Sequence, residues 1–223
     1  SVRYNLAKNP DQFLRRVVEL MSLGTGFPAF HNDDIGIRMM MNKGIPLQEA
    51  LGWSPGGCVE PYLAGKIRCL TEVGNFNLGS AVEYALTDGY RRRTGEYVGA
   101  RTGDPRTFGT YEDFETAIHR QLDYIIEAAV RGSHIIDDIC EQNRPCPALS
   151  MTFPECIENA KDFSTGGAKY CNGNGILMVG IADIVNSMAA VKKLVYDDKS
   201  ITMGELLDAL DRNFEGGERI QKL

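Results

Sequence analysis

The sequence has no long hydrophobic run. None of its segments approaches the roughly 20 consecutive apolar residues that cross a bilayer, and the first residues lack the basic-then-apolar order of a signal peptide. We therefore expect no membrane partner and a cytoplasmic location.

The sequence has no excess of basic residues. Lys and Arg total 24 against 30 Asp and Glu, which gives a formal net charge of −6. This acidic excess disfavours binding to a nucleic-acid backbone or to an anionic membrane surface. The short run Arg91-Arg92-Arg93 is too isolated to change that expectation.

The sequence lacks the spacings typical of metal and nucleotide sites. It has no Cys-x-x-Cys pair, and its three histidines do not lie at ligand spacing from its six cysteines. The glycine fingerprint of dinucleotide sites and the Walker lysine are absent too. Without an export signal, the cysteines are interpreted as free thiols. All except Cys58 lack an acid beside them in a turn and are interpreted as structural.

Apolar spacing predicts a helix-rich α/β chain. Helices are expected over 10–23, after the polar residues 31–34 through Met41, and over 45–51, 76–89, 111–131, 155–160, 182–196 and 203–214. Gly132-Ser133 is expected to separate the long helix from its continuation to about residue 142. Residues 27–30, 145–150 and 175–181 are predicted to be extended. Short strands between longer helices indicate a layered or barrel arrangement.

One segment, residues 54–61, combines turn-forming residues with reactive side chains. Glycines and prolines surround Cys58 and Glu60, which point to the same side if the segment is extended. A thiol beside a carboxylate can transfer hydrogen or attack while the acid moves a proton. The alternative is that Cys58 is a small buried side chain and Glu60 a solvated turn residue.

The motif Gly57-Cys58-Val59-Glu60-Pro61 resembles the barrel region of glycyl radical enzymes, the superfamily of pyruvate formate-lyase, and especially its dehydratase and lyase branches. Other segments are similar to the family pattern and occur in the expected order along nearly the whole chain. They are Phe27-Pro28-Ala29-Phe30 with Asn32-Asp33, Thr102-Gly103-Asp104-Pro105, Pro145 with Pro147 and Ser150, Gly166-Gly167-Ala168, Asp183 with Ser187-Met188-Ala189-Ala190, and Asn213-Phe214-Glu215-Gly216.

The resemblance implies that residues 1–223 are part of a single ten-stranded α/β barrel domain, with the cysteine loop inside the barrel. It implies that Cys58 carries a thiyl radical that takes hydrogen from a small substrate. Glu60 then acts as general base while water or an amine is eliminated. The resemblance also implies a homodimer, and a glycyl radical installed by an S-adenosylmethionine activating enzyme, with no cofactor bound by this chain.

Two departures from the family pattern affect these expectations. Nothing resembles the glycyl motif, so we expect a fragment that is inactive alone. A gap-free count from Cys58 reaches Glu72 where the dehydratase branch has an aspartate. Glu72, His31, Asp33, Trp53 and Tyr62 are candidate substrate-binding residues. Helix capping for His31 and Asp33, and core packing for Trp53 and Tyr62, are the competing interpretations.

Several other functions stay open. The Thr102–Arg106 loop and Pro145-Cys146-Pro147 resemble arylacetate decarboxylases of the same superfamily, and a formate acetyltransferase-like protein is a further alternative. A non-catalytic structural protein derived from the barrel would not need Cys58 and Glu60. A thiol hydrolase would need His31, His119 or His134 as the base for Cys58.

Overall fold

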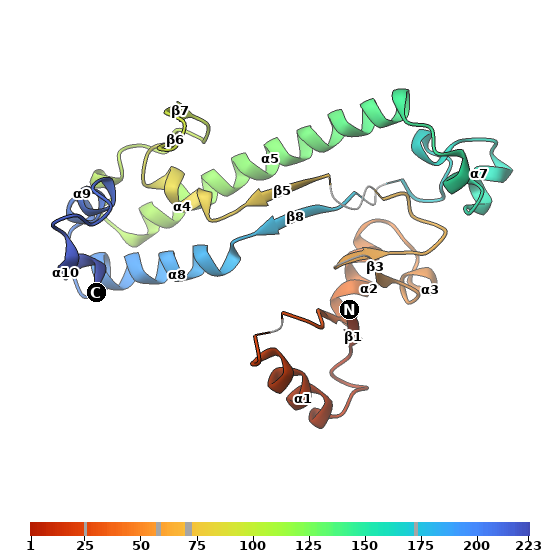
Figure 1. Cartoon of the computed structure of the whole chain (residues 1–223), viewed down its shortest axis with the longest axis horizontal. Helices are drawn as coiled ribbons and strands as arrows, with labels where there is room; N and C mark the ends of the chain where they lie inside the picture. The colour runs from red at the N-terminus through yellow and green to blue at the C-terminus, as the bar shows by residue number, and fades with distance from the viewer. Residues whose placement is uncertain (25, 57–58, 70–72, 172–173) are drawn as a thin grey trace. The chain divides into compact units, whose positions relative to one another are not determined.

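The chain forms two compact units. A computed structural model describes residues 1–24, 26–56, 59–69, 73–171 and 174–223. The first unit comprises residues 1–73 and 135–175, and the second comprises residues 74–134 and 176–223. Both units carry short strands between helices (Figure 1), which confirms the helix-rich α/β prediction.

The first unit begins with a parallel strand pair joined by a helix. Strand β1 (Val2–Tyr4) pairs with β2 (Phe30–Asn32), and α1 (Asp11–Met21) lies between them in the sequence. Helix α2 (Asp33–Asn42) follows at once, because the Asn32 side chain accepts hydrogen bonds from the backbone N–H groups of Asp34 and Ile35. Helix α3 (Leu47–Ala50) completes this segment. The first three predicted helices are confirmed.

The first unit also contains a hairpin, the end of helix α5 and three short helical segments. Strands β3 (Ser54–Gly56) and β4 (Glu60–Tyr62) are antiparallel. Helices α6 (Pro147–Ser150) and α7 (Pro154–Glu158) precede the 3-10 turn η2 (Phe163–Thr165). The extended prediction for 145–150 is wrong over Pro147–Ser150, because Pro147 suits the first turn of a helix. One core cluster of this unit contains Met40, Ile45, Ala50, Trp53, Leu63 and Ile67.

The second unit contains a parallel pair that replaces part of a predicted helix. Strand β5 (Gly74–Asn77) pairs with β8 (Ile176–Val179), and α4 (Ser80–Ala85) starts after it. A helix from residue 76 was therefore wrong in its first turn, since pairing with a strand about a hundred residues away overrides the local apolar spacing. Two short strands, β6 (Tyr90–Arg91) and β7 (Glu96–Tyr97), form a hairpin ahead of the 3-10 turn η1 (Pro105–Thr107).

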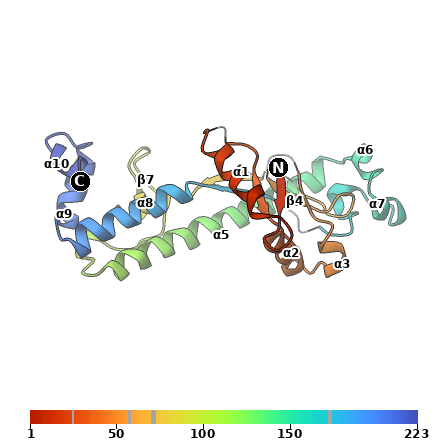
Figure 2. The same ribbon diagram turned by 90° about the horizontal axis from the view of Figure 1, so that it is seen from below.

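Helix α5 (Tyr111–Asn143) is continuous, so the predicted break at Gly132-Ser133 is wrong. A Cβ at Gly132 would meet no atom within 4 Å, and one glycine costs a helix only about 1 kcal/mol. Figures 1 and 2 show the helix unbroken. The core of the second unit packs α4 and the first part of α5 against α8 and α9. It includes Ala81, Val82, Ala85, Phe114, Ile118, Ile184, Val191, Met203 and Leu207.

The chain ends in helices that belong to the second unit. Helix α8 (Ile181–Val191) continues into a π-helical segment η3 (Lys192–Asp197), and α9 (Met203–Asp211) and α10 (Glu218–Gln221) follow. Thr202 and Glu205 form a reciprocal capping box at the start of α9. Across the described ranges, no helix is both long and apolar enough to cross a membrane.

Candidate functional site

The β3–β4 hairpin presents the candidate catalytic acid. Its register pairs Ser54 with Tyr62, Pro55 with Pro61 and Gly56 with Glu60. Because side chains alternate along a strand, Glu60 and Tyr62 share one face while Pro61 lies on the other. Proline has no N–H to donate, so the opposed prolines fit the hairpin as a pair without mutual hydrogen bonds.

The two residues at the end of this hairpin are Gly57 and Cys58, and they lie outside the described residues. Glu72, the other predicted acid, lies outside them as well. After the gap, the first described residue of the motif is Val59. Its backbone N–H donates a hydrogen bond to Glu60 Oε2 at 3.1 Å, so the carboxylate lies back toward the end of the hairpin.

The ring of Tyr62 lies over Gly56 of the opposite strand. A Cβ built on Gly56 would stand 1.6 Å from Cε2 and 2.0 Å from Cδ2 of Tyr62. Only glycine leaves room for the ring at this position. Burial raises the pKa of the Tyr62 phenol, with smaller contributions from Cys69 and Glu60.

Cys69, which the sequence predicts to be a structural thiol, lies close to this hairpin. Burial, the largest cause, raises its pKa, Lys43 opposes the rise, and the Glu60 carboxylate adds to it. The Gly175 backbone N–H also interacts with the thiol. The charges of Cys69 and Glu60 act on Tyr62, and that of Glu60 acts on Cys69, so the three groups lie near one another. No spacing rule links Cys69 to Glu60, since the turn after Leu63 brings them together.

Three other predicted residues form a second group, around Asp33. Asp33 Oδ1 accepts hydrogen bonds from Arg3 Nε at 2.7 Å and from Trp53 Nε1 at 3.0 Å. Trp53 is 2% exposed, and its ring meets His31 edge-on with centroids 6.0 Å apart. Asn32, rather than His31 or Asp33, caps α2. The contacts of Asp33 and Trp53 thus join β1, α2 and the residue before β3.

His31 keeps a polar atom without a protein partner. Its Nε2 is buried and has no hydrogen bond among the described residues. Burial is the main cause that lowers the pKa of the imidazole, so His31 is neutral at pH 7. Within those same residues, no three or more His, Cys, Asp or Glu side chains converge as a metal site would require.

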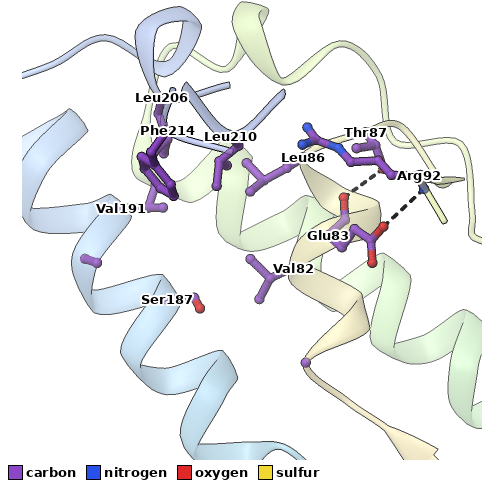
Figure 3. A pocket seen from close by; sticks show the side chains of 12 residues that line it. Val82, Glu83, Leu86, Thr87, Arg92, Ser187, Val191, Leu206, Leu210 and Phe214 are labelled. Atoms are coloured by element: carbon purple, nitrogen blue, oxygen red, sulfur yellow. Dashed lines mark hydrogen bonds between the residues drawn. The ribbon is translucent and has the colours of Figure 1, made fainter. Parts of the chain in front are cut away.

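The second unit has a cavity of its own, about 460 Å³ in volume, between α4, α8 and α9. Figure 3 shows Val82, Leu86, Val191, Leu206, Leu210 and Phe214 around it. Glu83 and Arg92 lie at its edge, where the Arg92 N–H donates to Glu83 Oε1 and the Arg92 guanidinium pairs with Asp211. None of the predicted site residues lines this mainly apolar cavity.

Known proteins match this chain over nearly all of its length. The family model described as "PFL-like: Pyruvate formate lyase-like" matches residues 1–223. The trans-4-hydroxy-L-proline dehydratase of Clostridioides difficile is 38% identical over 216 residues, which cover 97% of this chain and 27% of that protein. The isethionate sulfite-lyase of Oleidesulfovibrio alaskensis is 32% identical over 97% of this chain and 26% of its own length.

A solved structure gives the same result. The glycerol-bound B12-independent glycerol dehydratase of Clostridium butyricum superposes with a TM-score of 0.84 and 33% identity. The match covers 99% of this chain and 28% of that one. The chain therefore spans about a quarter of the length of the relatives that it matches.

Proposed function

Because the chain belongs to the pyruvate formate lyase-like family of glycyl radical enzymes, we propose that it carries the thiol and the base of a glycyl radical lyase. In this proposal the complete enzyme eliminates water from a small hydroxylated substrate, and Cys58 and Glu60 perform the chemistry. Two features support it. The Gly57–Pro61 motif is intact, and relatives at 32–38% identity are named as a dehydratase and a sulfite-lyase.

The hairpin register is the observation that carries the proposal. It places Glu60 at the start of β4, two residues after Cys58, on a face shared with Tyr62. The stored glycyl radical, which lies outside these residues, supplies the unpaired electron. Cys58 loses its thiol hydrogen and then takes one from a substrate carbon, a reversible exchange because the S–H and activated C–H bonds are similar in strength. Glu60 accepts the hydroxyl proton of the substrate radical.

The remaining expectations from the resemblance belong to the same proposal. They are the ten-stranded barrel with the cysteine loop inside it, the homodimer, the S-adenosylmethionine activating enzyme and the cytoplasmic location. The substrate-binding roles of Glu72, His31, Asp33, Trp53 and Tyr62 also stay predictions. Exclusion of water by the barrel would protect the radical from side reactions.

The test uses the complete polypeptide that carries residues 1–223, activated without oxygen. Electron paramagnetic resonance reports the glycine-centred doublet, and product analysis covers trans-4-hydroxy-L-proline, glycerol, isethionate, choline and 4-hydroxyphenylacetate. We expect the doublet in wild type and in Cys58→Ala, with turnover only in wild type. Glu60→Gln should keep the doublet and lose about 100-fold or more in kcat.

Each failure has its own signature. No doublet after competent activation would contradict the radical mechanism and favour a structural protein. Turnover of 4-hydroxyphenylacetate alone would replace dehydration with decarboxylation. Turnover that persists in Cys58→Ala would remove Cys58 from the mechanism.

A further inference from the structure

The position of the Tyr62 ring is unusual for a hairpin side chain. Gly56 and Glu60 are directly opposed, and directly opposed Cβ positions in an antiparallel pair lie about 4.5–5.5 Å apart. Tyr62 Cε2 and Cδ2 occupy the place where the Gly56 side chain would project. The phenol ring therefore lies in the cross-strand slot opposite Glu60.

Tyr62 combines a half-buried ring with a hydroxyl that can donate a hydrogen bond. In the part of the chain that the structure describes, this hydroxyl forms no hydrogen bond, and the residue is only half-buried. Burial holds the pKa of the phenol above its ordinary value, and the nearby Cys69 and Glu60 reinforce the effect. Tyr62 thus keeps its proton at neutral pH and can give it to a stronger base.

An elimination needs a group of this kind. Glu60 can take a proton from the substrate radical, but hydroxide is a poor leaving group unless an acid protonates it. Among the described residues, the Glu60 carboxylate is the base, and the phenol beside it keeps its proton and has no protein partner. From this juxtaposition we propose that Tyr62 is the acid that protonates the departing hydroxyl, paired with Glu60 as base, an inference that rests on the proposed lyase function.

The proton balance of the step closes within the hairpin. Glu60 takes the proton from the hydroxyl or amino group on the radical carbon. The neighbouring C–O bond breaks with its electron pair on oxygen, which receives the Tyr62 proton and leaves as water. The Tyr62 phenolate then recovers a proton from the Glu60 carboxylic acid, and the product radical takes back its hydrogen from the Cys58 thiol. No oxidant or reductant is consumed.

A purely structural role for Tyr62 makes a different prediction. The ring also packs beside the core cluster that contains Trp53 and Leu63, so its removal would disturb the hairpin. Tyr62→Phe keeps that packing and deletes only the hydroxyl. Tyr170→Phe is the matched control. Tyr170 packs beside the same core cluster, but its hydroxyl donates a hydrogen bond at 3.3 Å to Glu49, a carboxylate outside the proposed site.

The experiment compares leaving groups in the activated, complete polypeptide. The probes are trans-4-hydroxy-L-proline with trans-4-fluoro-L-proline, and glycerol with 2-fluoropropane-1,3-diol. Loss of hydroxyl should fall about 100- to 10,000-fold in kcat in Tyr62→Phe, with KM within about threefold. Loss of fluoride, which needs less protonation, should fall less than about tenfold. Tyr170→Phe should leave both rates unchanged.

Gly56→Ala provides a second variant, because the new methyl group would displace the ring while the hydroxyl remains. It should show the same selective loss of hydroxyl elimination. A kcat in Tyr62→Phe within about threefold of wild type, or equal losses for hydroxyl and fluoride, would overturn the role of Tyr62. The lyase function would then still stand on the doublet and on Cys58→Ala. Absence of both doublet and turnover in wild type would overturn the two together.

Discussion

The indole Nε1 of Trp53 donates a hydrogen bond to Asp33 Oδ1 at 3.0 Å, and Arg3 Nε donates to the same oxygen at 2.7 Å. The Arg3 guanidinium also lies over the Trp53 ring, 4.9 Å from its centroid. One carboxylate oxygen thus joins residues from the first strand, the start of α2 and the segment before the hairpin. A Cβ at Gly36 would come within 2.2 Å of the same ring, so α2 also packs closely on Trp53.

Trp53→Phe tests whether this tryptophan serves the fold or the substrate. The variant loses the donor to Asp33 and part of a ring that is 2% exposed. We expect the free energy of unfolding to fall by about 1–3 kcal/mol. KM should change less than about twofold if the contacts of Trp53 are purely structural. A large rise in KM with unchanged stability would instead support the predicted substrate-binding role.

Arg68 and Asp137 form the most deeply buried ion pair among the described residues. Arg68 Nη2 lies 2.9 Å from Asp137 Oδ1, and the Arg68 side chain is 3% exposed. Asp137→Ala leaves a buried guanidinium without its counter-charge. We expect a loss of about 3 kcal/mol or more in the free energy of unfolding, measured with urea.

The exposed pair between Arg131 and Glu127 is the control for this measurement. Its side chains are 75% and 62% exposed, and both residues lie on α5. Glu127→Ala should cost only about 0.5 kcal/mol. Equal costs for the two variants would mean that burial does not strengthen the Arg68 pair.

Gln121 attaches the loop before η1 to helix α5. It is 0% exposed, its Oε1 accepts from the Ala100 N–H at 2.9 Å, and its Nε2 donates to the Ala100 carbonyl at 2.7 Å. Gln121→Leu leaves both backbone groups without partners, so we expect a loss of about 2–3 kcal/mol. Limited proteolysis of this variant should then cut near Ala100. The control is Gln142→Leu at an exposed position, whose free energy of unfolding should stay within about 0.5 kcal/mol of wild type.

The carboxylate of Asp162 makes the free energy of unfolding depend on pH in the acid range. Hydrogen bonds from the Ser164 hydroxyl, the Cys146 N–H, the Ser164 N–H and the Ser150 hydroxyl hold its pKa far below the ordinary value. The unfolded chain therefore binds more protons as the pH falls below about 5. The stabilisation is complete above the unfolded pKa and is lost as the pH falls toward the folded one.

The melting temperature of wild type should consequently fall more steeply than that of Asp162→Asn between about pH 5 and pH 3. Ser150→Ala removes one of the hydrogen bonds and should give an intermediate slope. Parallel curves for wild type and Asp162→Asn would show that this carboxylate contributes nothing to the pH dependence.

Local patterns predicted most helices because those helices have clear ends and one apolar face. The helix over 10–23 and the two closing helices follow apolar spacing, and the structure has them within a few residues. The wrong predictions concern a segment that pairs with a strand far away in the sequence and a glycine that the helix accommodates. Phe76 pairs with Met178 in a sheet, and Gly132 sits in an uninterrupted helix.

For the candidate site, the sequence alone determined the Gly57–Pro61 motif and the family resemblance. It also determined that Glu60 shares one face of an extended segment with the residues two positions before and after it. Covalent spacing and strand alternation are sufficient for these. Only the tertiary structure decided that Tyr62 fills the slot at Gly56, that Cys69 lies near Glu60, and that Asp33 accepts hydrogen bonds from Arg3 and Trp53. Such contacts depend on turns and on packing between separate segments, which no local pattern specifies.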